Sequence, residues 1–476
     1  MAALRMKNVL FTISLCTPFL LMATITILPT FDDFTTLQSP QFTPLLHELL
    51  LPNDSFWRPF DYLFGCLLGR HIWLFPALNH IVITLGHAAN AVLLWAVCRE
   101  FKLSHTAADI ATLFFFFSTA TLGTTLAVDG LNQTFSQLWG LAALHVYMKT
   151  RQKPLKHVLW PLFVMMAALS KENGLAWAVV IPLLAFTFSI TGKRTALRDT
   201  GIGLLTALAY LTARLLLAVT ADINSEYTEA TLASHLKDLL QLLAFTFLPI
   251  DYMSLLYAPS RNWLLAAATL LLAMPFVGVM FFGNTTTGFR NKRFWGLLAA
   301  FLIIVSPHLL TLVSIMHNYA GLSLAAIITA FLIDSNRFQR RTVITAFLLF
   351  TLSAAVADVH HFMYARQSGF LGRQMASQVI DLTKGEPENV ACITVCDDAT
   401  PKYSSFGVRP VDCFAWGESV RYYTGYRWPR TLENFNVDKQ DSLALRHLTD
   451  SLLHHPQSKV ECLWIVSDHS IEVLRP

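Results

Sequence analysis

Long apolar runs recur along most of this chain of 476 residues. An α-helix needs about 20 mostly apolar residues to cross a bilayer, and about eleven segments approach that length. Lys, Arg, Asp and Glu together make up only 14% of the residues, whereas an ordinary soluble domain has about a quarter. The sequence therefore predicts an all-α polytopic membrane protein. The predicted spans lie near 8–28, 72–97, 106–127, 133–148, 157–170, 174–191, 199–220, 262–282, 294–316, 319–334 and 341–357.

Lys and Arg are distributed unevenly between the loops that join these segments. Basic residues such as Arg99, Lys102, Arg290 and Lys292 fall in one set of loops, and most acidic residues fall in the opposite set. Loops rich in Lys and Arg stay on the cytoplasmic side, which predicts a cytoplasmic N-terminus if 237–258 lies on the outer surface or re-enters. The net charge of +4 is the sum of these two faces, so we expect no nucleic-acid partner.

The chain changes character after residue 357, where apolar runs of spanning length end and charged residues return. Residues 1–357 are therefore predicted to form a transmembrane domain, with 29–71 as its first outer loop. Residues 358–476 are predicted to form a small extracytoplasmic domain. The count of spans places this second domain on the outer side of the membrane.

Two apolar stretches in this C-terminal part, 390–398 and 461–468, are typical of short buried strands, and 441–455 has helical apolar spacing. The pattern predicts a small α/β domain. An outer location would favour disulfides among its cysteines, with three possible pairings; free buried thiols and a metal site are the alternatives. The cysteines concerned are Cys392, Cys396, Cys413 and Cys462.

Ionisable residues at or near the predicted outer ends of the apolar segments are the best functional candidates, because charges in or near a membrane are costly. These residues are Asp32, Asp33, Arg58, His80, His87, Asp129, Lys171, Glu172 and Arg214. Their common depth predicts a polar cavity at the outer membrane boundary. Asp32 or Asp33 could deprotonate an acceptor hydroxyl, while Arg58, Lys171 and Arg214 could hold a phosphate.

Each candidate also has a purely structural interpretation. Aspartates after a helix can lie in a solvated loop or cap the next helix, and arginines can anchor at headgroups or extend to the surface. Histidines seven residues apart, as His80 and His87 are, can hydrogen-bond between helices. Lys171 and Glu172 can neutralise each other, and Asp129 suits a turn. No cofactor is certain, although a divalent metal could take oxygen ligands from Asp32, Asp33, Asp129 and Glu172.

An ordered set of motifs resembles the GT-C superfamily of integral-membrane glycosyltransferases. The set comprises "FDDF" at 31–34, "FWRPF" at 56–60, the histidine pair and "ALSKENGLAW" at 168–177. The likeness covers roughly residues 8–335 and is closest to the TMTC-type protein O-mannosyltransferase group and its bacterial relatives. It implies a multi-helix fold with an outward cavity, a polyprenyl-phosphate-linked sugar as donor, and an acidic base in the first outer loop.

The same resemblance implies roles for single residues. The base would be Asp32 or Asp33, Arg58 would belong to a "YRP"-like motif, and Lys171 and Glu172 would belong to an "SKE" motif. These last three residues would line the donor-phosphate region. Asp129 would line the cavity or meet the acceptor.

The chain departs from the family pattern at several places. Ile83 occupies the position of an expected Asn between the two histidines, and "HNYAG" at 317–321 lacks the arginine of an "RY" pair. The tail contains no 34-residue helical repeat of the kind that follows the membrane part of TMTC-type proteins. Acceptor recognition should therefore differ from theirs.

The sequence thus predicts a membrane glycosyltransferase that moves a sugar from a lipid-phosphate donor to the hydroxyl of an unknown glycan, lipid or protein. A transporter or flippase for a lipid or small solute could use the same polar cavity, and a catalytically silent scaffold is a third interpretation. Transporters often have halves with related hydropathy, and no such repeat is evident here. Membrane lipids are expected partners, and a bacterial inner membrane is the expected location.

Overall fold

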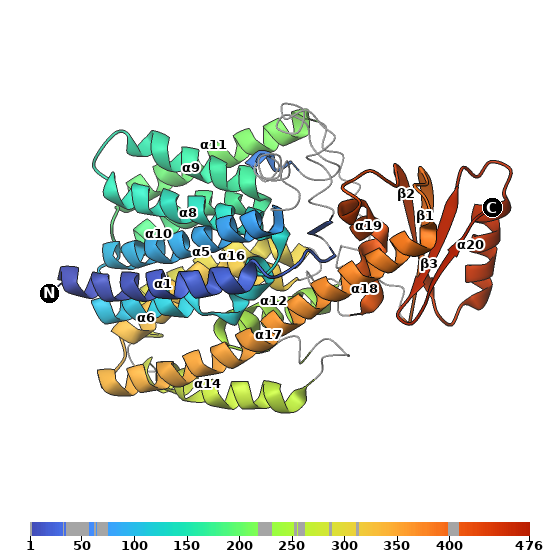
Figure 1. Ribbon diagram of the computed structural model, residues 1–476. Coiled ribbons are helices and arrows are strands. Elements are labelled where there is room, and N and C mark those ends of the chain that lie inside the picture. Colours follow the sequence, from blue (N-terminus) through green and yellow to red (C-terminus); the bar gives the residue numbers. More distant parts are fainter. Residues whose placement is uncertain are drawn as a thin grey trace.

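The fold is described from a computed structural model. It describes residues 2–31, 33–34, 57–60, 63, 75–217, 231–251, 255, 262–284, 288–310, 314–397 and 409–476. Apolar helices form a bundle, and a four-stranded sheet with its own helices lies at the end of the molecule opposite the N-terminus (Figure 1). One long helix, α17, runs from the bundle into the region of the sheet.

The described helices of the bundle are mostly 11 to 26 residues long. They are α1 (Ala2–Thr24), α5 (Phe75–Glu100), α6 (His105–Phe116), α8 (Leu131–Lys149), α9 (Lys156–Ser170), α10 (Trp177–Thr187), α11 (Lys193–Leu216), α12 (Leu232–Phe247), α14 (Trp263–Asn284), α15 (Lys292–Val305), α16 (Asn318–Asp334) and α17 (Arg340–Thr383). Short helical turns connect several of them: η1 (Thr119–Thr121), α7 (Leu122–Thr125), η2 (Val128–Gly130), η3 (Glu172–Ala176), η6 (Ser306–Leu310) and η7 (Ile315–His317).

Five helices in the described part of the chain are long and apolar enough to cross a membrane, or six if the bent pair formed by His105–Phe116 and Thr119–Thr125 is one span. The chain is therefore a multi-pass membrane protein, and the total of eleven spans stays a prediction. The span Ile315–Asp334 is 94% buried inside the bundle, whereas Trp263–Asn284 is only 28% buried. A helix that is apolar all round belongs either in a core or against lipid, and these two helices illustrate both cases.

Helix α17 is 44 residues long and continues without a break past residue 357, where the sequence pattern places the end of the membrane domain. Its first half packs along α14, where Phe276 contacts Phe347 and Phe350, and Ser353 Oγ donates to the carbonyl of Thr269 at 2.5 Å. The predicted boundary therefore falls inside a continuous helix. The hydropathy pattern shows where the apolar run ends, but the helix continues beyond that point with a polar face and a buried face.

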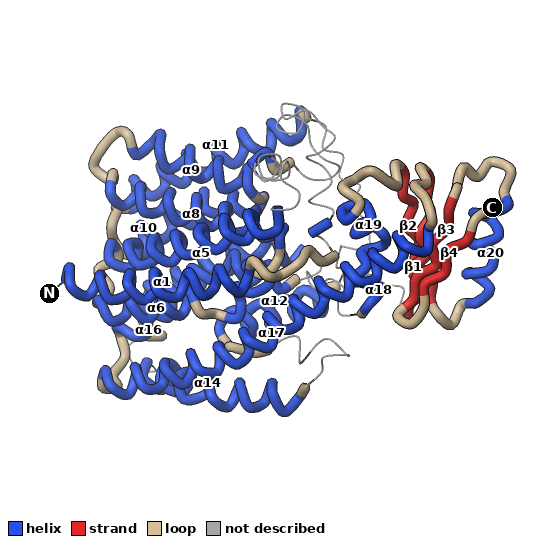
Figure 2. Tube along the Cα trace, in the orientation of Figure 1, coloured by secondary structure: helices blue, strands red, loops and turns tan. Residues whose placement is uncertain are grey.

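The C-terminal domain contains one sheet with the strand order β2-β1-β3-β4 (Figure 2). Its elements are β1 (Asn389–Cys396), α18 (Pro410–Phe414), η8 (Ala415–Gly417), α19 (Glu418–Tyr423), β2 (Thr431–Asp438), α20 (Ser442–His454), β3 (Cys462–Ser467) and β4 (Ile471–Leu474). The central strand β1 pairs in parallel with β2 and β3, and β4 is antiparallel to β3.

The predicted strands at 390–398 and 461–468 and the helix at 441–455 are confirmed as β1, β3 and α20. The edge strands β2 and β4 were not predicted, because neither has a continuous apolar run: β2 is half exposed, and β4 is four residues long and mostly half-buried. The expected disulfides are not formed among the described cysteines: Cys392, Cys396, Cys413 and Cys462 are buried thiols, which was one of the alternatives. They therefore act as small apolar residues of the domain core.

Candidate functional site

The short stretch at 27–34, which we call the acid loop, comes shortly after α1, which ends at Thr24. Asp33 in this loop is almost completely buried, and both of its carboxylate oxygens accept backbone hydrogen bonds. Oδ2 accepts from Thr30 N at 2.8 Å, and Oδ1 accepts from Val128 N at 2.7 Å and Asp129 N at 3.1 Å. The carboxylate therefore joins the acid loop to the turn between α7 and α8. Asp32, the other candidate base, lies outside the described residues.

Asp129 lies in this turn, within η2, beside Asp33. Burial raises the pKa of Asp33 well above the ordinary aspartate value, and the negative charge of Asp129 raises it further, while the three backbone N–H groups oppose both effects. Burial also raises the pKa of Asp129, and the positive charges of Lys171 and Arg58 act against that rise. Two neighbouring buried carboxyl groups thus have different surroundings: backbone N–H groups stabilise the carboxylate of Asp33, and positive side chains stabilise that of Asp129. Such an arrangement is suited to proton transfer.

Lys171 and Glu172 lie where α9 ends and η3 begins. Lys171 has an extended backbone, which breaks the helix, and Gly174 allows the chain to turn tightly because a Cβ there would overlap the carbonyl of Ala167. Glu172 accepts three hydrogen bonds from Arg58, two from Nε at 3.1 Å and one from Nη2 at 2.9 Å. Lys171 Nζ donates to Asn132 Oδ1 at 3.3 Å. The turn therefore presents a cation and a fixed ion pair together.

Two histidines that the sequence interpretation assigned no role belong to the same cluster. The rings of His308 and His317 stack with centroids 4.2 Å apart, and His308 Nε2 lies 3.2 Å from Asn173 Nδ2. Asn173 Oδ1 in turn accepts from Ser136 at 3.3 Å. His317 begins the segment "HNYAG" at 317–321, which lacks the arginine that the sequence resemblance would place there. The sequence alone can draw attention to an ionisable residue at the end of an apolar run. It does not show that the segment of His308 packs against the turn that contains Asn173.

The remaining predicted site residues lie in different surroundings. His80 is fully buried against the backbone of Ile27 and Thr125, behind the acid loop. Arg214 lies one helical turn beyond Tyr210, whose ring stacks on Trp57 at 5.5 Å. Both residues therefore lie beside the group formed by Asp33, Asp129, Lys171 and Glu172 and not within it.

His87 is a structural residue of the bundle interior. Its Nε2 lies 3.2 Å from the carbonyl of Phe116, and its Nδ1 lies 3.0 Å from Tyr319 Oη. A carbonyl can only accept, so Nε2 carries the hydrogen and Nδ1 accepts from the tyrosine. Both ring nitrogens are used, and the ring stacks on Phe115 and Phe116. This geometry matches the interhelical alternative for His87 and not a place in a phosphate cavity.

The proposed oxygen ligands do not form a metal site in the described part of the chain. Glu172 already receives Arg58 at both oxygens, Asp33 receives backbone N–H groups at both oxygens, and Asp32 is not among the described residues. No group of three or more His, Cys, Asp or Glu within the described ranges could hold a metal ion. The described donor set therefore does not fit a divalent cation, and no step below uses one.

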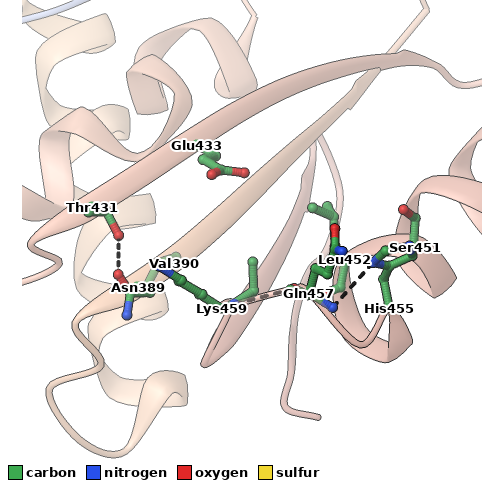
Figure 3. Close-up of a pocket in the computed structure, with 11 residues that line it drawn as sticks. Asn389, Val390, Thr431, Glu433, Ser451, Leu452, His455, Gln457 and Lys459 are labelled. Atoms are coloured by element: carbon green, nitrogen blue, oxygen red, sulfur yellow. Dashed lines mark hydrogen bonds between the residues drawn. The ribbon is translucent and has the colours of Figure 1, made fainter.

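A cavity of about 400 Å³ lies elsewhere, in the C-terminal domain between the first residues of β1 and β2 and the end of α20 (Figure 3). Its lining includes Glu433, His455 and Lys459, and Thr431 donates to Asn389 Oδ1 at one edge. These side chains come from the sheet and α20, not from the acid loop. The cavity is therefore separate from the cluster of predicted residues.

The acid-loop cluster combines groups that can take up a proton, groups that carry positive charge, and imidazole rings. We define it as Asp33, Arg58, Asp129, Lys171, Glu172, His308 and His317. Asp33 and Asp129 can take up a proton, and Asp129 Oδ1 is buried without a hydrogen-bond donor among the described residues. Lys171 and Arg58 supply positive charge that reaches Asp129. The imidazole pair supplies further donors and acceptors. This combination suits the transfer of a group between a hydroxyl and a phosphate.

Comparisons with known proteins give a distant structural likeness. No family model and no curated protein match the chain. Fifteen chains of solved structures match it. Two are archaeal oligosaccharyltransferase AglB from Archaeoglobus fulgidus in complex with an inhibitory peptide and a dolichol-phosphate, and the oligosaccharyltransferase of the same organism in complex with Zn and sulfate.

Both structures align with a TM-score of 0.46 and 11% sequence identity, and the alignments cover 90% of this chain. They cover 64% and 62% of the archaeal chains, so this chain spans less than two thirds of their length. A likeness of this size carries no argument about activity. The function has to be argued from the residues of the acid-loop cluster.

Proposed function

We propose that this protein is a membrane glycosyltransferase of the GT-C type, which moves a sugar from a polyprenyl-phosphate donor to an acceptor hydroxyl on the outer side of the membrane. An aspartate of the acid loop acts as the general base. The alternative of a lipid or small-solute transporter uses the same polar residues. The sugar and the acceptor are left open.

The observation that carries the proposal is the meeting of Asp33 and Asp129 with Lys171 and the Arg58–Glu172 pair at one end of an apolar bundle. These residues are up to 139 positions apart in the sequence, between Asp33 and Glu172, and each lies at the end of a helix or in a turn. A translocation path would instead distribute polar groups through the bundle towards the midplane. The gathering at one end therefore favours an enzyme that meets a lipid-borne substrate at the membrane boundary.

The reaction follows from these groups. A carboxylate of the acid loop accepts the proton of the acceptor hydroxyl, and the acceptor oxygen forms a bond to the anomeric carbon of the donor sugar. The bond between that carbon and the phosphate oxygen breaks, and polyprenyl phosphate leaves with the electron pair. Lys171 and Arg58 stabilise the negative charge that grows on the phosphate. A single displacement of this kind inverts the configuration at the anomeric carbon.

His308 and His317 complete the phosphate side of the proposed site. They face the Lys171 turn through Asn173, at the segment where the family resemblance would place an arginine. We assign them to donor binding in place of that arginine. The acceptor would approach the acid loop, because Asp33 and Asp129 come from α1 and α7–α8 and not from the phosphate side.

The test is sugar transfer from a panel of labelled polyprenyl-phosphate sugars by the purified full chain in nanodiscs. Asp33→Asn and Asp32→Asn are compared with the wild type, and Asp334→Asn is the matched control. Asp334 accepts a hydrogen bond from Ser104 N at 3.0 Å, which an Asn oxygen can also accept. Loss of a general base should lower kcat by roughly 10²- to 10⁴-fold.

Transfer by the wild type and the Asp334 variant, abolished in one acid-loop variant that still binds donor, would support the proposal and identify the base. No transfer and no donor hydrolysis with any sugar would contradict it. Lipid or solute movement across proteoliposomes that depends on Asp33 would then support the transporter.

A further inference from the structure

The C-terminal domain covers the acid loop with aromatic rings on both sides of Asp33. Phe31, two residues before Asp33, lies 4.6 Å from Trp416 between ring centroids. Phe34, directly after Asp33, contacts the rings of Tyr422 and Tyr423 at 5.6 and 6.2 Å. Phe34 is 1% exposed. The two neighbours of the carboxylate are therefore held by the domain that follows α17.

The backbone around Trp416 adopts an unusual conformation. Ala415, Trp416 and Gly417 are three successive residues with positive φ, at 54°, 48° and 84°. Phe31, on the other side of the contact, also has a positive φ of 34°. Such conformations cost free energy in residues other than glycine and persist only when the surroundings impose them. Trp416 Nε1 also donates to Asn436 Oδ1 on β2 at 2.6 Å, which fixes the indole to the sheet.

Helix α17 places the domain against the loop. A Cβ at Gly369 would lie 2.7 Å from the carbonyl of Leu28 in the acid loop, and a Cβ at Gly372 would overlap the carbonyl of Cys413 in α18. The two glycines are three residues apart, so they lie on one face of the helix. One side of α17 therefore touches both the acid loop and the segment that leads to Trp416.

We propose that the C-terminal domain positions the Asp33 carboxylate, with Trp416 and Tyr422 as the positioning residues that act through Phe31 and Phe34. This inference rests on the proposed function only for its effect on turnover. The domain is then part of the active-site architecture, since Asp33 meets Val128 and Asp129 correctly only while its neighbours are held. A misplacement of about 1 Å at a catalytic group can lower a rate on the order of 100-fold.

The experiment uses the full chain in nanodiscs with Trp416→Ala, Trp416→Phe and the control Trp428→Phe. Trp428 packs on Trp464 in the core of the same domain, with centroids 6.3 Å apart. Hydrogen exchange of the peptide that contains Val128 and Asp129 reports on Asp33 directly, because those two amides donate to its carboxylate. Sugar transfer, where the wild type has it, gives kcat and the KM for the donor separately.

Trp416→Ala should speed exchange of that peptide and lower kcat by roughly 10- to 100-fold with little change in donor KM. Trp416→Phe should restore most of both properties, and Trp428→Phe should resemble the wild type. If Trp416→Ala does not fold, Tyr422→Leu makes the same test from α19.

Exchange that stays at the wild-type rate in Trp416→Ala, or in Tyr422→Leu where that variant replaces it, would overturn the inference. Equal acceleration in Trp428→Phe would also overturn it, because the effect would then be one of domain stability. A wild type without transfer would contradict the proposed function alone, since the exchange measurement does not depend on turnover.

Discussion

Buried charges occur at both ends of the helical bundle, and the two clusters differ in how completely their members are paired. At the end away from the acid loop, Lys156 Nζ lies 2.8 Å from Asp199 Oδ2, and Tyr147 Oη donates to the same oxygen at 2.5 Å. The side chains of Lys156 and Asp199 are 2% and 0% exposed. We call these three residues the Lys156 brace, because they join α8, α9 and α11.

The acid-loop cluster contains more acidic groups than its ion pairs account for. Glu172 is matched by Arg58, but Asp33 lies beside Asp129, whose negative charge raises the pKa of Asp33. Asp129 Oδ1 has no donor among the described residues.

In the Lys156 brace the single carboxylate of Asp199 is well supplied with basic partners, since Arg198 Nε lies 3.4 Å from Oδ1 in addition to the Lys156 ammonium at Oδ2. A buried polar atom that lacks a partner is expected where a substrate supplies the missing group. This difference is the one expected if the Lys156 brace is structural and the acid-loop cluster is the proposed functional site.

The largest effect on stability is expected at the brace. Lys156→Met removes the buried ammonium from Asp199 and leaves the largely exposed Arg198, 3.4 Å from Oδ1, as its nearest cation. Breaking a buried pair costs about 3–5 kcal/mol of unfolding free energy, and Arg198 should place the loss near the lower end of that range. The measurement is thermal unfolding in detergent, together with transfer activity per folded molecule, which should not change. Lys153→Met, a few residues away on the exposed loop before α9, is the matched control. A brace variant that keeps its stability but loses activity would remove the distinction between the two clusters.

Lys171 should show the opposite behaviour. Lys171→Met removes a cation from the side of the acid-loop cluster that we propose binds the donor phosphate, and loss of a hydrogen bond to a charged group is worth about 1.5–3 kcal/mol. The expected result is a kcat/KM for the donor about 10- to 100-fold lower, with a smaller change in stability than at Lys156. Lys237→Met on the exposed side of α12 is the control. A fall in stability as large as that of Lys156→Met would make Lys171 a second brace.

The sequence predicted the class of fold because apolar runs and strand patterns are local properties. The multi-pass bundle, β1, β3 and α20 follow from such patterns. The domain limit at 357 falls within α17 because a helix can continue after its apolar face has ended. The strands β2 and β4 carry few buried side chains, so their pairing depends on β1 and β3 and not on their own composition.

The candidate residues were predictable only in part, because a sequence pattern is local whereas the contacts between candidate residues are not. Asp33, Arg58, Asp129, Lys171 and Glu172 stand out because a charge at the end of an apolar run is unusual, and the structure brings them together. His87 lies near the middle of α5, and both of its ring nitrogens form hydrogen bonds inside the bundle. The contact of His308 with Asn173 joins segments distant in sequence, and the contacts of Trp416 and Tyr422 with the acid loop join different domains. No local pattern encodes those contacts.

The smallest predicted effect is a shift in the pH dependence of activity, and it concerns the neighbouring carboxyl groups of Asp33 and Asp129. The negative charge of Asp129 raises the pKa of Asp33, so Asp129→Asn should lower that pKa. A general base works in its deprotonated form, so activity falls as pH drops through the pKa of the base. The acidic limb of the kcat/KM profile should therefore move to lower pH in Asp129→Asn. The control Asp109→Asn, whose partner Trp95 lies towards the other end of α5, should leave the profile unchanged.

The direction of that shift carries the information. If the limb moves to lower pH, Asp33 is the titrating base and Asp129 is its electrostatic neighbour. A limb that does not move would place the titrating group elsewhere in the acid loop. Complete loss of activity at every pH would make Asp129 itself the base, with the buried oxygen that lacks a described donor as the proton acceptor.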